Sequence, residues 1–123
     1  MSYFRITAML IDVKFINRTT YGRAGIQFKF KTTSNELILR TFNIPKKVSE
    51  KSELIKALSR SDMIVTDRDL ERSTHLVLKI KNALLDRSFT LLCEKSKNPK
   101  YPTNIKSILT TISEYFTDTL SNK

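Results

Sequence analysis

The residues of this chain with the clearest chemical potential are lysines and arginines, and they gather in strand-like segments. Residues 1–48 carry nine Lys or Arg and two Asp or Glu, and residues 74–102 carry six and two. Residues 49–73 carry five and six, and residues 103–123 carry two of each. The formal net charge of +10 therefore lies in the strand-like segments. Such a positive surface suits a nucleic acid, an anionic membrane or an acidic protein.

A single strand of nucleic acid needs cations for its phosphates and flat faces for its unstacked bases. The segments that alternate like strands, and the loops between them, offer both. The candidate nucleic-acid-binding residues are Arg18, Tyr21, Arg23, Lys29, Lys31, Arg40, Lys79, Lys81, Arg87, Lys95 and Lys97. The aromatic candidates for base stacking are Tyr3, Tyr21, Phe42 and Tyr101. Phe28 and Phe30 alternate with Ile26, which favours a place in the core.

The sequence gives little support for metal binding, nucleophilic catalysis or nucleotide binding. His75 and Cys93 are the single histidine and the single cysteine, and they lie far apart, so we expect no zinc site. Cys93 shares an alternating face with Phe89 and Leu91, which favours a small core residue over a nucleophile. The glycine-containing loop 17–25 has neither a P-loop lysine nor a dinucleotide fingerprint. We therefore expect a non-enzymatic protein without a cofactor.

An acidic cluster between residues 62 and 71 has two interpretations. Its carboxylates could hold Mg²⁺ for a nuclease. They are interleaved with arginines, however, which favours a solvated loop that pairs with itself. The acidic residues are Asp62, Asp67, Asp69 and Glu71, and the arginines are Arg68 and Arg72.

The first third of the chain has the pattern of three strands. Tyr3 to Ile16 is dense in β-branched and aromatic residues and is apolar on both faces near its middle. Ile26 to Thr32 alternates cleanly between apolar and polar residues. Glu36 to Ile44 follows after a tight turn at 33–35, and Pro45 ends it.

The middle of the chain predicts a helix. Ser49 is a good N-cap with Glu50 in the first turn, and Leu54, Ala57 and Leu58 give an apolar stripe, so the helix spans about 49–60. A short helical turn is expected around Asp69–Arg72.

The last third predicts two strands and a helix. His75 to Asn82 and Phe89 to Glu94 both alternate in the manner of strands. After the proline-punctuated segment 98–102, a helix is expected over 103–120. Its apolar residues fall at helical spacing and are Ile105, Ile108, Leu109, Ile112, Phe116 and Leu120.

The order β-β-β-α-β-β is that of the OB-fold, a five-stranded, partly open barrel. We expect a mainly β protein with helices. Residues 1–102 would form the barrel, with a plug helix near 49–60. The helix at 103–120 would pack on the same domain, and the alternative is that it forms a dimer or partner interface. In the OB-fold the face of strands 2 and 3 binds oligonucleotides.

Two segments resemble small OB-fold single-stranded-DNA-binding proteins of phages and mobile elements. Thr41–Ser59 resembles their join between an aromatic strand end and a polar helix start. Leu70–Asn98 resembles their paired fourth and fifth strands with a basic outer face. The chain departs from that pattern in having Ala83–Asp86 where a glycine-rich turn is common. It also ends in Ser121-Asn122-Lys123 where many have an acidic tail.

These observations favour a protein that binds single-stranded nucleic acid, DNA above RNA, with little sequence preference. The processes that it would serve are replication, recombination or transfer of a mobile element. The alternative is a protein-interaction module or inhibitor that docks its basic face on an acidic protein. No apolar run approaches the roughly 18 residues of a transmembrane helix, so no membrane partner is expected. One cysteine and an N-terminus without signal-peptide features favour a cytoplasmic location.

Overall fold

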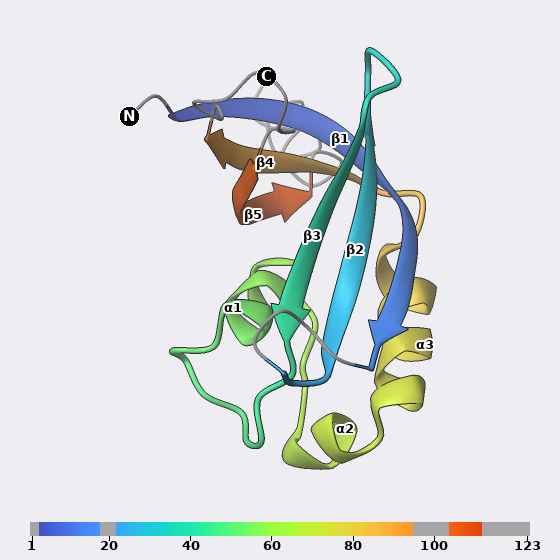
Figure 1. Ribbon diagram of the computed structural model, residues 1–123, viewed down its shortest axis with the longest axis vertical. Coiled ribbons are helices and arrows are strands. Elements are labelled where there is room, and N and C mark those ends of the chain that lie inside the picture. The colour runs from blue at the N-terminus through green and yellow to red at the C-terminus, as the bar shows by residue number, and fades with distance from the viewer. Residues whose placement is uncertain (1–2, 18–21, 95–103, 112–123) are drawn as a thin grey trace, which may run out of the picture.

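The structure, a computed structural model, describes residues 3–17, 22–94 and 104–111 (Figure 1). Its strands are β1 (Tyr3–Ile16), β2 (Gly25–Thr32), β3 (Leu37–Asn43), β4 (Ser88–Glu94) and β5 (Asn104–Thr111). The helices lie between β3 and β4 in the chain and are α1 (Glu53–Arg60), α2 (Asp67–Glu71) and α3 (Ser73–Leu84). The protein is mainly β with helices, as the alternating segments predicted.

Strands β1 to β4 form a curled antiparallel sheet, a half-barrel, in which β1 is paired on both sides. The strand order is β3-β2-β1-β4, and β5 joins the far edge of β4. β1 pairs with β4 from Tyr3 to Met9 and with β2 from Ala8 to Ile16. A single strand of 14 residues therefore connects the two halves of the sheet.

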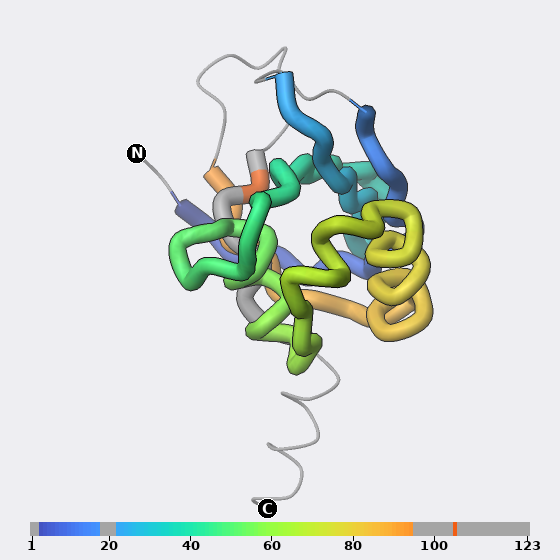
Figure 2. Tube along the Cα trace, turned by 90° about the horizontal axis from the view of Figure 1, so that it is seen from below, coloured from blue at the N-terminus to red at the C-terminus, as the bar shows by residue number. Residues whose placement is uncertain are grey.

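β1 changes its neighbour at a bulge. Its register with β2 shifts between Leu10 and Asp12, which leaves Ile11 without a partner on β2. A bulge bends the strand and increases its twist. At this point Leu10 donates its N–H to the Arg87 carbonyl at 2.9 Å, and Asp86 donates its N–H to the Leu10 carbonyl at 2.8 Å. Beyond the bulge, α3 lies beside β1 in place of β4 (Figures 1 and 2).

The inner face of the half-barrel and the buried sides of the helices share one core. Phe28 packs edge-on against Phe42 with 5.3 Å between ring centroids, and Phe30 packs in the same way against Phe89 at 5.9 Å. Burial of an aromatic side chain stabilises the fold by about 1.5–3 kcal/mol. The core position predicted for Phe28 and Phe30 is confirmed. Phe42, which was expected to stack on bases, is only 4% exposed, so that prediction is wrong.

Helix α1 packs an apolar stripe against the rest of the fold and contacts β3 and β5. The helix predicted near 49–60 is confirmed over 53–60, but its N-cap is Ser52. The Ser52 hydroxyl accepts the Ile55 N–H at 3.4 Å, whereas the Ser49 hydroxyl accepts the Lys51 N–H at 3.2 Å in the preceding turn. The buried residues of α1 are Leu54, Ala57 and Leu58, as predicted.

The strand predicted over His75–Asn82 is wrong, because these residues lie in α3. Leu78 would share one face with Leu76 and Ile80 in a strand, but it is 55% exposed. Leu76, Ile80 and Leu84 follow one another at a spacing of four residues, which places them on one side of a helix. All three side chains are buried. The helix runs beside the part of β1 that β4 does not reach, and it buries this stripe there (Figure 2).

The helix predicted over 103–120 is also wrong where the structure describes it, because 104–111 is strand β5. Ile105, Ile108, Thr110 and Thr111 are β-branched, and such side chains favour a strand when a partner is present. β4 supplies that partner along its free edge. Ile105 is buried in the core, so β5 belongs to the main fold. Residues 112–120 lie outside the described part, and the oligomer expected through this helix gains no support from 104–111.

The remaining strand predictions are confirmed within a residue or two. Ile26–Thr32 and Glu36–Ile44 correspond to β2 and β3, and Phe89–Glu94 corresponds to β4. The tight turn between β2 and β3 is closed by the Asn35 N–H, which donates to the Thr32 carbonyl at 3.0 Å. Asn35 has a φ of 66°, a left-handed conformation that asparagine tolerates better than most residues.

The helical register of α3 can be tested with two alanine variants. Ile80 is 0% exposed and Leu78 is 55% exposed. Ile80→Ala should lower the free energy of unfolding by about 2–5 kcal/mol. Leu78→Ala should change it by less than about 0.5 kcal/mol. Urea unfolding followed by circular dichroism measures both. Equal losses would favour the strand, because there the two side chains would share one face.

Candidate nucleic-acid interface

Two of the predicted cations stand on the solvent side of β2. Lys29 and Lys31 alternate with the buried Phe28 and Phe30, so their side chains point away from the core. Lys31 is exposed and Lys29 is half-buried. The clean alternation of β2 is what made this orientation predictable from the sequence.

The neighbouring strands place each of these lysines in a row of three side chains. The rows run from β1 through β2 to β3, and antiparallel pairing brings facing side chains within about 5 Å of one another. We call these nine residues the outer sheet face. They are Met9, Lys31 and Leu37 in one row, Asp12, Lys29 and Leu39 in the next, and Lys14, Gln27 and Thr41 in the third.

The outer sheet face also exposes large apolar side chains. Leu37 and Leu39 are each 51% exposed, and Met9 is 41% exposed. These residues and Lys14 were not predicted as candidates from the sequence. The alternation of β3 could have identified Leu37 and Leu39, because it places them on the side of the strand opposite to Phe42. Lysines beside exposed apolar groups can hold phosphates and cover the faces of bases at the same time.

Arg40 was expected on the same surface, but the structure places it elsewhere. It alternates with the exposed Leu39 and shares the side of β3 that bears Ile38 and Phe42. Its guanidinium carbon lies 4.8 Å from the centroid of the Phe42 ring. Arg40 and Arg23 line a cavity of about 370 Å³ beside the start of α1. The two arginines are therefore brought together, but away from Lys29 and Lys31.

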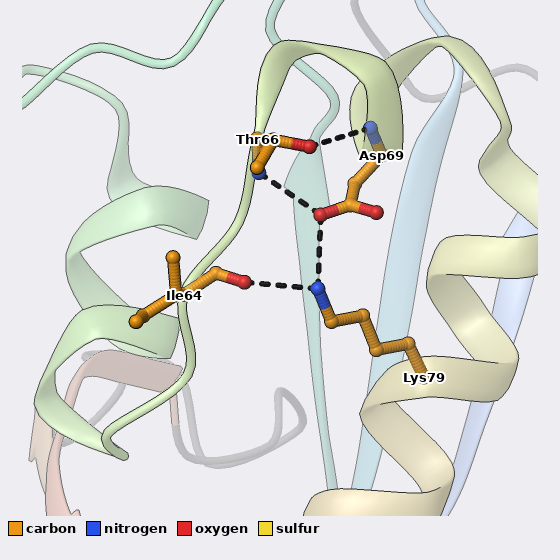
Figure 3. Close-up of polar contacts among 4 residues, drawn as sticks. All are labelled: Ile64, Thr66, Asp69 and Lys79. Atoms are coloured by element: carbon orange, nitrogen blue, oxygen red, sulfur yellow. Dashed lines mark hydrogen bonds and ion pairs between the residues drawn. The ribbon is translucent and has the colours of Figure 1, made fainter.

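Lys79 and Lys81 belong to α3 and not to a sheet surface, which corrects the place predicted for them. Lys79 Nζ donates at 3.0 Å to the Asp69 carboxylate and at 3.0 Å to the Ile64 carbonyl (Figure 3). Lys79 thus ties α3 to α2 and to the segment before α2. We remove it from the candidate interface, since its charge already has a partner.

Lys81 and Arg87 border the outer sheet face from the side of α3. Lys81 Nζ lies 3.5 Å from the Asp12 carboxylate, so the one acidic group of the outer sheet face has a cationic partner. Arg87 is exposed in the turn between α3 and β4, where its carbonyl accepts the Leu10 N–H. Both therefore lie near the point at which β1 bends.

Four predicted site residues lie outside the described part of the chain. Arg18 and Tyr21 belong to the connection between β1 and β2, and Lys95 and Lys97 belong to the connection between β4 and β5. Tyr101, one of the stacking candidates, lies in that second connection. Of the aromatic candidates, Tyr3 and Phe42 are described: Tyr3 is 54% exposed at the start of β1, whereas Phe42 is buried in the core.

The acidic cluster serves local structure. Asp69 and Thr66 form a capping box at the start of α2: Asp69 accepts the Thr66 N–H at 2.9 Å, and the Thr66 hydroxyl accepts the Asp69 N–H at 3.3 Å (Figure 3). Asp67 accepts the Val48 N–H at 2.7 Å. The partners of Asp67 and Asp69 are thus backbone groups and Lys79, and the described residues show no ion pair to Arg68 or Arg72, so pairing with the interleaved arginines is not supported. The helical turn expected near 69–72 is α2, one to two residues earlier. Among residues 3–17, 22–94 and 104–111, no group of three His, Cys, Asp or Glu side chains could hold a metal ion.

Cys93 lies in the core and His75 lies at the surface. Cys93 is fully buried, and desolvation by burial raises the pKa of its thiol to about 11. A thiol of this kind stays protonated at neutral pH and is a poor nucleophile. The core position predicted for Cys93 is therefore confirmed. His75 is exposed near the start of α3, as the sequence allowed.

Comparison with known proteins finds no matching family model and no curated protein with significant sequence similarity. Within the part of the chain that the structure describes, none of the helices has both the length and the apolar character needed to cross a membrane. The candidate interface therefore rests on its own geometry.

The Asp69 contacts make a pH-dependent prediction. The Thr66 N–H and Lys79 lower the pKa of Asp69 to about 2, below its ordinary value of 3.8. The ionised carboxylate therefore stabilises the fold above about pH 4, and this contribution fades as the pH falls toward 2. Asp69→Asn should lower the free energy of unfolding at pH 6 by about 0.5–2 kcal/mol, as loss of a helix cap does. The deficit relative to the wild type should shrink at pH 3.

Urea unfolding at the two pH values measures this difference. Asp62→Asn is a suitable control because Asp62 is exposed, and asparagine tolerates its φ of 61°. A deficit for Asp69→Asn that stays the same from pH 6 to pH 3 would contradict the role assigned to the carboxylate.

Proposed function

We propose that this chain is a non-enzymatic protein that binds single-stranded nucleic acid, DNA in preference to RNA, with little sequence preference. The proposal extends to a role in replication, recombination or transfer of a mobile element. The observation that carries it is the outer sheet face, where Lys29 and Lys31 of β2 stand in the same rows as exposed apolar side chains. This combination suits a ligand with a charged backbone and flat, apolar bases.

The fold offers support through its topology, which we propose is OB-like. Three strands of a meander are followed by helices, and β4 then returns to pair with β1. The two ends of the strand order, β3 and β5, contact each other, as the closing strands of a partly open barrel do. α1, with its buried stripe against β3 and β5, would act as the plug helix. In such barrels the face of strands 2 and 3 is the one that binds oligonucleotides.

The outer sheet face can follow a strand of nucleic acid in a simple way. Lys29 and Lys31 lie two residues apart, about 6.8 Å along β2, a step that an extended sugar–phosphate backbone can match. Lys14 extends the cationic line on β1. Because Asp12 already faces Lys81, its negative charge opposes the phosphates only weakly. Bases would then lie over Met9, Leu37 and Leu39.

One observation favours the second candidate function, a module that docks on an acidic protein. The exposed apolar side chains of the outer sheet face are aliphatic, whereas stacking on bases is strongest for aromatic side chains. Leucine and methionine beside lysine also suit an acidic, partly apolar protein surface. This candidate predicts no measurable affinity for oligonucleotides, so the titration below separates the two.

The proposal predicts the effect of a double charge reversal. Lys29→Glu combined with Lys31→Glu should weaken binding of an oligo-dT strand at least tenfold, because two phosphate contacts become repulsive. Each phosphate contact contributes about −0.7 to the slope of log K against log salt concentration. The slope should therefore become shallower by about 1.4. Fluorescence anisotropy across a salt series measures both quantities.

Lys56→Glu provides the matched control. Lys56 lies on α1, away from the outer sheet face, and its 3.5 Å pair with Glu53 is exposed, so its reversal should leave affinity and slope unchanged. Circular dichroism melts establish that all variants are folded. A wild-type protein with no affinity, or with a flat salt response, would reject the proposal and leave the adaptor.

A further inference from the structure

A cavity of about 370 Å³ lies between the end of β3 and the start of α1, and it meets the outer sheet face only at Thr41. Its volume is at the lower end of the range typical of small-ligand sites, roughly 300–1,000 Å³. Arg23, Arg40 and Phe42 line one part of it, and Ser52, Glu53 and Leu54 line another. β3 ends the strand order beside β2, and its other neighbours are β5 and α1, so the cavity lies where the end of β3 meets the start of α1.

Arg40 is in an unusual position for a charged residue. It faces Phe28 in the register of β2 and β3, and it alternates with Ile38 and Phe42, which are both buried. Its guanidinium carbon lies over the Phe42 ring, 4.8 Å from the centroid. Arg40 Nε is buried and has no hydrogen-bond partner among the residues that the structure describes. A buried donor of this kind normally has a partner. Because Nε itself is closed to solvent, a ligand in the cavity would contact the part of the half-buried Arg40 side chain that lines it.

The remaining charges of the cavity also favour an anion. Arg23 brings a second guanidinium from the segment before β2. Glu53 is the carboxylate among these residues, and it lies 3.5 Å from Lys56 Nζ, which offsets its charge. The first residues of α1 complete the lining, and the start of a helix carries a partial positive charge. Two arginines with fixed donors recognise a phosphate group better than a single ammonium does.

We propose that this cavity binds a phosphate group, with Arg40 and Arg23 as its principal ligands. The site borders the outer sheet face at Thr41, but its arginines are not part of that face, because Arg40 and Leu39 point to opposite sides of β3. It therefore does not depend on the proposed function. The phosphate can come from two sources, the terminal phosphate of a nucleic-acid strand or a free phosphate compound. The chemistry of recognition is the same in both cases.

Isothermal titration calorimetry of the full chain with inorganic phosphate, at constant ionic strength in chloride, tests the site. The wild type should bind, and Arg40→Met and Arg23→Met should each weaken binding at least tenfold. Arg68→Met, an exposed arginine on α2, is the matched control and should bind like the wild type. Arg23 is exposed, so its variant remains informative if Arg40→Met fails to fold. Lys29→Glu with Lys31→Glu should also leave phosphate binding unchanged.

Oligo-dT with and without a 5′-phosphate distinguishes the sources. A gain of at least tenfold from the 5′-phosphate, lost in Arg40→Met and Arg23→Met, would assign the site to strand ends. Equal binding of the two oligonucleotides, together with binding of inorganic phosphate, would assign it to a free phosphate compound. If the wild type binds neither inorganic phosphate nor the 5′-phosphate, or if both variants bind like the wild type, the proposal is overturned. Failure of the outer sheet face to bind oligo-dT would reject the proposed function alone.

Discussion

The rest of the structure depends on how strand β1 is paired. One edge of β1 pairs with β2, and the opposite edge contacts first β4 and then α3. β4 covers that edge from Tyr3 to Met9, and α3 covers it afterwards, while β2 lies along the opposite edge. The change takes place at the Leu10–Asp12 bulge, where the turn before β4 donates to and accepts from Leu10. The sheet can curl because this one strand bends.

This arrangement separates the cationic groups of the protein into three environments. Lys14, Lys29 and Lys31 stay on the open side of the sheet, where Lys29 and Lys31 stand beside exposed apolar side chains. Arg40 is turned toward the core side at the end of β3, where α1 closes a cavity around it. The lysines of α3 are used internally or at its border, with Asp69 and Asp12 as partners. The net charge of +10 therefore does not indicate which cations form a binding site, because the cations in each environment make a different kind of contact.

The sequence predicted the parts of the fold that local patterns decide. β2 alternates without ambiguity, so Phe28 and Phe30 could be assigned to the core and Lys29 and Lys31 to the solvent. α3 could not be assigned in this way, because Leu76 and Ile80 fit both a strand and a helix. These residues form a helix because the part of β1 that β4 does not reach is covered by the apolar stripe of α3. β5 has helical spacing in its sequence, and it is a strand because β4 offers it an edge.

The candidate site shows the same division. The outward direction of Lys29 was predictable, whereas its neighbours Met9 and Leu39 depend on strand register, which the sequence leaves open. Lys79 was wrongly assigned to the interface because residues 75–82 were predicted to form a strand. Its partner Asp69 comes within reach only when residues 73–84 form a helix. Alternation along β3 was enough to predict that the Arg40 side chain lies on the same side of the strand as Ile38 and Phe42. The cavity beside Arg40 could not be predicted without knowing where α1 lies, because the start of α1 forms part of its lining.

The most direct test of the account is to map where a single strand lies. An NMR titration of the ¹⁵N-labelled protein with oligo-dT reports on each backbone amide separately. The account predicts that the largest shifts occur on the outer sheet face, at Lys29, Lys31 and Leu39, with little change along the exposed side of α3. Shifts concentrated on α3, or a spectrum that does not change at saturating oligo-dT, would contradict it.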